Sequence, residues 1–147
     1  GAAQFGNAHN LGVEKGTGRT TAVCTNNGVA VGDDAANPAN GGQNLAPRPM
    51  EAVLAGTGGC TAYDVVLILK RGRHDVRGGS VKLTSERAPA DPKVFTRIHM
   101  HFTVTGKDIP ASAVERAIAM SHDKYCSASI MLAKTAEITT SFELTPV

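Results

Sequence analysis

Residues 49–70 read PMEAVLAGTGGCTAYDVVLILK, and this stretch decides the fold. Pro49 suits the first turn of a helix, where its missing N–H costs nothing, and Glu51 suits the positive end of the helix dipole. From Ala62 to Leu69 the stretch is apolar almost all round, which predicts a helix that is buried on most of its faces. We therefore predict a long helix from Met50 to about Lys70 that other elements must cover.

On either side of this helix, short runs of alternating polarity predict strands, and a 3.6-residue apolar period predicts further helices. Between Val94 and Thr105, for example, Ile98 and Met100 alternate with His99 and His101. The predicted order is strands at 20–25 and 29–31, the helix at 50–70, strands at 76–86 and 94–105, helices at 110–122 and 126–134, and a strand at 137–144. Because this order contains no regular βαβ repeat, it predicts an α+β fold, and the length of 147 residues suits a single domain over 1–147.

The long helix also predicts a partner. A helix that is apolar on most faces needs cover on most faces, and the rest of the chain is short. Gly56, Gly58 and Gly59 each cost about 1 kcal/mol relative to alanine inside a helix. We attribute these glycines to the close approach of another backbone or to space around Cys60. We therefore expect an intimate homodimer in which this helix packs near its symmetry mate.

The composition argues against several classes of function. The net charge is only +2, aromatic residues make up 4% and there is no Trp, so nucleic-acid binding has no support. The sequence contains no evident signal peptide and no obvious membrane span, so we expect no membrane partner. Three cysteines at irregular spacing favour a reducing compartment, and the expected location is cytoplasmic.

Two cysteines in different settings suggest redox chemistry. Cys60 lies beside glycines inside the long helix, and Cys126 lies in KYCSAS between two helix-like runs. Neither is part of a CxxC pair, which argues against a local zinc site. If the fold brings the two cysteines together, they form a thiol pair that can be oxidised to a disulfide. The opposite interpretation is that both are inert small hydrophobic residues, and we expect this of Cys24.

A reactive thiol needs help to ionise, from a helix N-terminus or a nearby cation. Cys126 stands at a predicted helix N-terminus, whereas Cys60 is too far into its helix to benefit from the dipole. Arg19 and Arg48 are candidate cations for Cys60, and Glu51 could hold such an arginine through a bidentate ion pair.

Several other polar residues allow two interpretations each. Asp64 lies four residues after Cys60, so it either raises the pKa of that thiol or makes a buried polar contact, for example with a Lys or Arg across the dimer. His122 and Lys124 flank Cys126 and either stabilise its thiolate or belong to the surface. His99 and His101 could bind a metal, alone or together with the cysteines, or they could form the solvent-exposed face of a strand; overall we expect neither a metal nor a cofactor.

The residues around both cysteines resemble a known family. The run NLAPRPME at 44–51 leading into GGCTAYDVV at 58–66 resembles the first signature of the OsmC/Ohr family. The run PKVFTRIHMHF at 92–102 followed by KYCSAS at 124–129 resembles its second half. The match extends over roughly residues 40–145 and is nearest to the OsmC-like branch that carries a GGCTA helix and a KYCS motif, rather than to Ohr or OsmC proper.

This resemblance implies a fold, a function and a set of residue roles. The family fold is an intertwined α+β homodimer with two long central helices and curved antiparallel sheets. Its characterised members are thiol peroxidases that reduce organic hydroperoxides and are recycled by a dithiol such as dihydrolipoamide. By motif position Cys60 would attack the peroxide and Cys126 would resolve the sulfenic acid, while Glu51 would fix the activating arginine, whose nearest counterpart is Arg19. A different outcome is a non-catalytic protein that keeps the fold and binds an apolar small molecule at the dimer interface.

Overall fold

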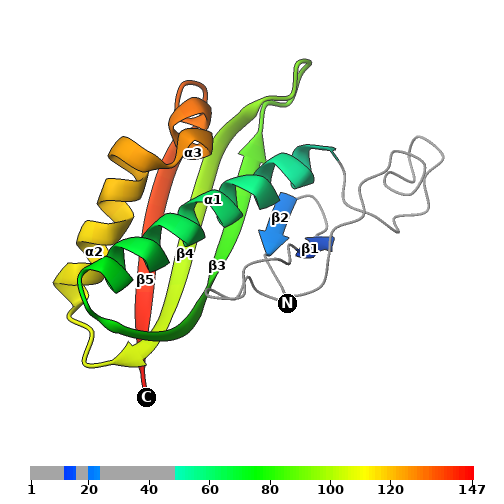
Figure 1. Ribbon diagram of the computed structural model, residues 1–147. Coiled ribbons are helices and arrows are strands. Elements are labelled where there is room, and N and C mark those ends of the chain that lie inside the picture. The colour runs from blue at the N-terminus through cyan, green and yellow to red at the C-terminus, as the bar shows by residue number, and fades with distance from the viewer. Residues whose placement is uncertain (1–11, 16–19, 24–48) are drawn as a thin grey trace.

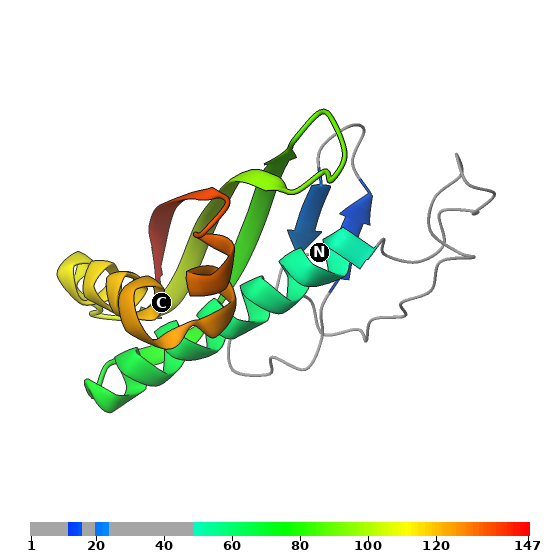
Figure 2. The same cartoon turned by 90° about the horizontal axis from the view of Figure 1, so that it is seen from above.

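A five-stranded sheet carries all of the α-helices on one face (Figures 1 and 2). The computed structural model describes residues 12–15, 20–23 and 49–147. Its elements are β1 (Gly12–Lys15), β2 (Thr20–Val23), α1 (Pro49–Arg71), β3 (Asp75–Arg87), β4 (Phe95–Lys107), α2 (Ala111–Met120), the π-helical turn η3 (Ser121–Tyr125), α3 (Ser127–Leu132) and β5 (Glu137–Pro146). The α+β prediction is confirmed, and the elements after residue 48 follow in the predicted order.

The sheet has the strand order β1-β2-β3-β4-β5. The first three pairings are antiparallel, as the family resemblance implied, and β4 and β5 are parallel, so the sheet is mixed. The physical reason is the connection between β4 and β5: helices α2 and α3 carry the chain back along the sheet, so that β5 enters in the same direction as β4. The predicted strand at 29–31, its turn and the loop before Pro49 lie outside the described residues.

Helix α1 crosses the sheet diagonally and supplies one side of the core. Its inward residues meet the inward residues of β3 and β4, which alternate with polar residues as a half-buried strand requires. The largest buried apolar side chains are Phe95, Phe102, Leu54, Leu69, Leu83, Ile98, Met100, Val65, Val81, Val104 and Val114. By length and hydropathy alone α1 could span a membrane, but half of its most apolar window is buried against the rest of the chain, as in a core helix.

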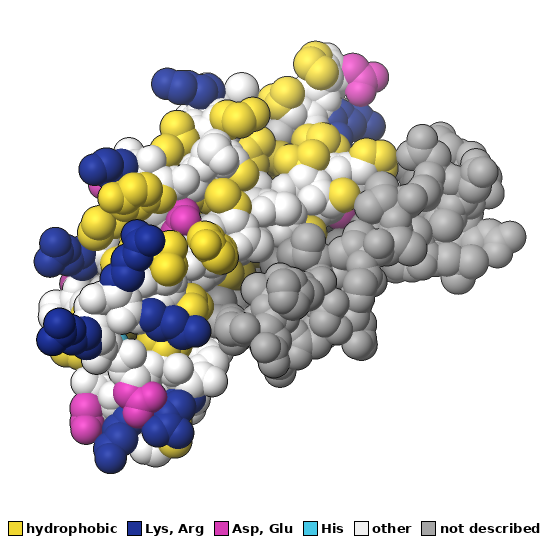
Figure 3. All heavy atoms as spheres, in the orientation of Figure 1, with side chains coloured by type: hydrophobic (Ala, Val, Ile, Leu, Met, Phe, Trp, Pro, Cys, Tyr) yellow, Lys and Arg dark blue, Asp and Glu magenta, His cyan; other side chains and the backbone are white. Residues whose placement is uncertain are grey.

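The outward side of α1 is partly apolar. Val53 is 43% exposed and Tyr63 is 62% exposed, and a Cβ added to Gly56 would meet nothing within 4 Å. Figure 3 shows apolar side chains gathered on this face of the molecule, with basic side chains toward one end. The described part of this chain therefore does not explain Gly56 by a close backbone approach, and it leaves Val53 and Tyr63 exposed on this side of α1.

The predicted helix over 110–122 changes character near its end. The α-helical part stops at Met120, and the next five residues form η3, closed by a hydrogen bond of 2.7 Å from the Cys126 N–H to the Ser121 carbonyl. This wider turn places Ser121 against α1 and brings Cys126 to the start of α3, which shapes the site described next.

Candidate functional site

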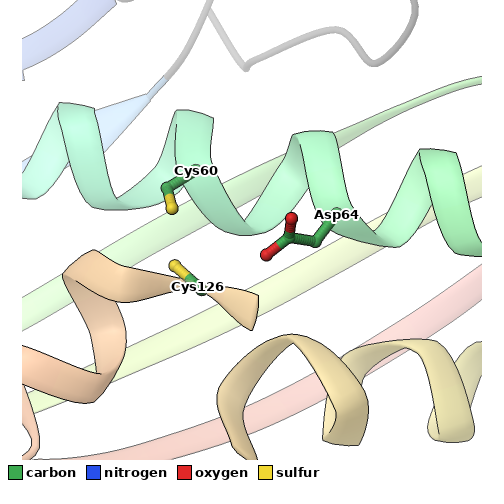
Figure 4. A group of neighbouring side chains, drawn as sticks. All are labelled: Cys60, Asp64 and Cys126. Carbon is green, nitrogen blue, oxygen red and sulfur yellow. The ribbon is translucent and has the colours of Figure 1, made fainter. Parts of the chain in front are cut away.

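Cys60 and Cys126 lie face to face although they are far apart in the sequence (Figure 4). Cys60 comes from the middle of α1 and Cys126 from the junction between η3 and α3. Their sulfurs and a carboxylate oxygen of Asp64 all lie within 4.8 Å of one another. Both thiols are reduced in this structure, and Cys126 is fully buried while Cys60 is partly exposed. The fold thus creates the thiol pair that the sequence suggested, with only Cys60 open to solvent.

Cys126 is held by the helix that it begins. Its backbone is extended, with φ −79° and ψ 96°, and its side chain caps α3 by accepting a hydrogen bond of 3.4 Å from the Ser129 N–H. The Ser129 hydroxyl donates in return to the Cys126 carbonyl at 3.2 Å. These two contacts fix the direction of the Cys126 sulfur toward α1.

Burial raises the pKa of the Cys126 thiol to about 11, and a hydrogen bond to Cys60 adds to the rise, while the contacts with Ser129 oppose it. Cys126 is therefore protonated at neutral pH and able to donate its S–H to the Cys60 sulfur. Burial therefore makes Cys126 a hydrogen-bond donor rather than a thiolate.

Asp64 is fixed by a short relay of hydroxyl groups. The Ser121 hydroxyl donates to Asp64 Oδ2 at 3.0 Å, and the Thr61 hydroxyl lies 2.9 Å from the Ser121 oxygen. Because the single Ser121 proton points to the carboxylate, Thr61 is the donor in the second bond. Burial raises the pKa of Asp64, opposed by this bond and by nearby His122. The polar contact expected of Asp64 is therefore made within the chain, to a serine.

Glu51 is the one residue of the predicted Arg–Glu pair that the structure describes. Glu51 lies in the first turn of α1 and is only 6% exposed, while its expected partner Arg19 lies outside the described residues. Arg48 and Cys24 lie outside them as well. A buried carboxylate of this kind needs a hydrogen-bond or ion-pair partner.

His122 and Lys124 behave differently although both flank Cys126. Lys124 is exposed, and its Nζ lies 5.4 Å from the centre of the Tyr125 ring. Burial lowers the pKa of His122, and the negative charges of Asp123 and Asp64 act against this shift. The electrostatic partner of His122 in the site is thus Asp64.

His99 and His101 lie on the polar face of the sheet, away from the helices. His99 contacts Thr139 and Ser141, at 2.7 and 2.9 Å, and His101 contacts Ser141 at 2.7 Å. This is a hydrogen-bonded ladder between β4 and β5, as expected for the wet face of a strand. Neither histidine belongs to the group formed by the thiols and Asp64.

A small hollow adjoins Asp64. It has a volume of about 270 Å³ and is lined by Asp64, Leu67, Ile68, Arg71, Met120 and Tyr125. Most of these side chains are apolar or carry a long aliphatic stem, so the hollow suits a small organic group.

The sequence analysis did not identify Thr61 or Ser121 as site residues, nor the two hydrogen bonds that Ser129 makes with Cys126. Thr61 and Ser121 are fully or almost fully buried hydroxyl residues, and such residues need partners. The position of Thr61 directly after Cys60 was the available signal, but Ser121 joins the site only through the π-helical turn.

The fold and the thiol pair define an α+β dithiol protein, and comparison with known proteins gives the family. The model of the OsmC-like protein family matches residues 41–141, so this chain belongs to the OsmC-like family. Protein YhfA of Escherichia coli K12 is 54% identical over 99 residues, which cover 67% of this chain and 74% of YhfA.

Solved structures agree with this assignment. A structural-genomics protein is 39% identical and has a TM-score of 0.70, with coverage of 94% of this chain and 99% of its own. An organic hydroperoxide resistance protein OsmC from Legionella pneumophila is 15% identical and has a TM-score of 0.59, with coverage of 90% and 94%. At that identity the second likeness concerns the fold alone. The predicted family membership is confirmed.

Proposed function

We propose that this protein is a thiol peroxidase that reduces organic hydroperoxides to alcohols. The observation that carries the proposal is the approach of the Cys60 and Cys126 sulfurs to within 4.8 Å, with Cys60 partly exposed and Cys126 buried. Membership of the OsmC-like family and the name of the Legionella relative support a role in handling peroxide.

In the proposed first step, the Cys60 thiolate attacks one peroxide oxygen and the O–O bond breaks. The alkoxide leaves and takes up a proton to become the alcohol, and Cys60 becomes a sulfenic acid. Cys126 keeps its proton at neutral pH, so its S–H can donate a hydrogen bond to the Cys60 sulfur during this step. The hollow beside Asp64 offers room for the organic part of the substrate.

In the second step the Cys126 sulfur attacks the sulfenic acid, an S–S bond forms and water leaves. A dithiol, for which a lipoyl group is one candidate, then reduces the disulfide by thiol–disulfide exchange and is itself oxidised to a disulfide. Glu51 would hold Arg19 beside Cys60 as the activating cation. The position of Glu51 in the first turn of α1, where it is only 6% exposed, supports this role, because a buried carboxylate suits a bidentate ion pair with an arginine.

The peroxidase proposal is tested by consumption of cumene hydroperoxide with a dithiol donor and a metal chelator present. Cys60→Ser should abolish consumption, since it removes the attacking sulfur. Cys126→Ser should complete the first step and then accumulate a sulfenic acid that dimedone traps. Cys24→Ser is the matched control and should consume peroxide at the wild-type rate; an unchanged rate in Cys60→Ser would refute the proposal.

We also propose that the protein works as a cytoplasmic homodimer. The exposed apolar residues Val53 and Tyr63 and the unobstructed Gly56 on α1 support a second copy packed along this helix. The same interface would be the location for an apolar ligand if the protein were a binder without catalysis. A reaction of Cys60 with cumene hydroperoxide separates these two functions.

A further inference from the structure

Three potential ligands for a soft metal ion converge at the thiol pair. The Cys60 and Cys126 sulfurs and a carboxylate oxygen of Asp64 all lie within 4.8 Å of one another. In the part of the chain that the structure describes, this is the one group of three or more His, Cys, Asp or Glu side chains with such a spacing. The third member is an aspartate and not one of the histidines on β4.

The spacing is close to what a tetrahedral zinc ion needs. With Zn–S bonds of about 2.3 Å and a tetrahedral angle, two zinc-bound sulfurs stand about 3.8 Å apart. The sulfurs therefore need to move together by no more than about 1 Å, which side-chain rotation supplies. Ligands from two rigid helical elements, α1 and the start of α3, would hold the ion between them.

The surroundings of the ligands are already ordered. Ser129 directs the Cys126 sulfur through its N–H, and Ser121 fixes one oxygen of Asp64, which leaves the other oxygen of the carboxylate to face an ion. Metal sites typically depend on such outer hydrogen bonds to orient their ligands.

The donor atoms of the cluster indicate which cation it would bind. Two thiols and one carboxylate lie within 4.8 Å of one another, and a divalent ion bound there would displace the thiol protons, because cysteine binds metals as the thiolate. Two thiolates and one carboxylate form a donor set that suits Zn²⁺ better than Mg²⁺ or Ca²⁺, which prefer oxygen ligands alone.

We propose that the reduced protein binds one Zn²⁺ per chain through Cys60 Sγ, Cys126 Sγ and a carboxylate oxygen of Asp64, with water at the fourth position. The bound ion and the Cys60–Cys126 disulfide exclude each other, because both need the same sulfur lone pairs. Diamide supplies the oxidation for a test: it takes two electrons and two protons from the dithiol, the S–S bond forms, and diamide becomes the hydrazine. Zinc is then no longer bound.

The test is a titration of reduced protein with Zn²⁺ in competition with a chromogenic chelator, in a Cys24→Ser background. One equivalent should bind, and Cys60→Ser and Cys126→Ser should each lose stoichiometric binding. Asp64→Asn should weaken binding by about 10-fold or more, because even the loss of an outer hydrogen-bond partner costs about 10–100-fold in metal affinity. Co²⁺ gives a second readout, since thiolate coordination produces charge-transfer absorption that either cysteine variant should remove. Circular dichroism confirms that each variant is folded.

A His99→Ala/His101→Ala protein is the matched control for adventitious binding at surface imidazoles and should bind Zn²⁺ as the wild type does. The proposal is overturned if Asp64→Asn binds as tightly as the wild type, if Cys126→Ser keeps stoichiometric binding, if diamide-oxidised protein still binds, or if the histidine variant alone loses the ion. No peroxide is present in this titration, and the peroxide assay contains a chelator. Failure of one proposal is therefore distinguishable from failure of the other.

Discussion

Ser121→Ala would break the chain of hydrogen bonds from Thr61 through Ser121 to Asp64, and we expect it to lower the free energy of unfolding. Ser121 is fully buried and joins Thr61, also fully buried, to the carboxylate of Asp64. Alanine would leave the Thr61 hydroxyl without its acceptor, at a cost of about 1–2 kcal/mol, and would remove a hydrogen bond to a charged group worth about 1.5–3 kcal/mol. Because Asp64 is only partly buried, we discount the second figure and expect a loss of about 2–3 kcal/mol in the free energy of unfolding.

Urea unfolding of the reduced protein at pH 7 measures this loss through the midpoint and the slope. Thr61→Val and the double variant complete a double-mutant cycle, which should show a coupling energy of at least about 0.5 kcal/mol between the two hydroxyls. Ser127→Ala is the control, since Ser127 is exposed in the first turn of α3 and should lose no more than about 0.5 kcal/mol. If Ser121→Ala and Ser127→Ala lose the same small amount, or if the cycle shows no coupling, the relay does not stabilise the site.

Two further predictions concern the thiol and the dimer. In reduced, metal-free protein, burial raises the pKa of Cys126 from about 9 in the unfolded state to about 11 in the folded state, so the folded state holds the proton more tightly. The free energy of unfolding, measured relative to Cys126→Ala, should therefore be constant below pH 9. It should fall by up to about 2–3 kcal/mol as the pH rises to 11. The same pH dependence in Cys126→Ala, followed by urea unfolding, would contradict this. Tyr63→Glu places a charge on the outward side of α1 and should shift the protein from dimer to monomer in analytical ultracentrifugation, whereas Thr96→Glu at an exposed strand position should not. A wild-type protein that sediments as a monomer would contradict the proposed dimer.

Much of the fold was predictable because it depends on local patterns. The apolar run after Cys60 predicted α1 to within one residue at each end, and the alternation around Ile98 predicted β4 with its buried and wet faces. The parallel pairing of β5 with β4 was not predicted, because strand direction depends on how the intervening helices return across the sheet. No local sequence pattern predicts the direction in which α2 and α3 return the chain across the sheet.

The candidate site shows the same division. Sequence alone selected Cys60 and Cys126 from their settings and the family motifs, and it placed Asp64 on the same helix face as Cys60, since the helical period is a local property. Only the tertiary structure decided that Ser121 would hold Asp64, that Cys126 would be buried and Cys60 partly exposed, and that His99 and His101 would lie away from the thiols. The physical reason is that burial and contacts between distant residues depend on the packing of α1 against η3 and α3. The sequence therefore determined which groups are available for chemistry, and packing decided which of them meet.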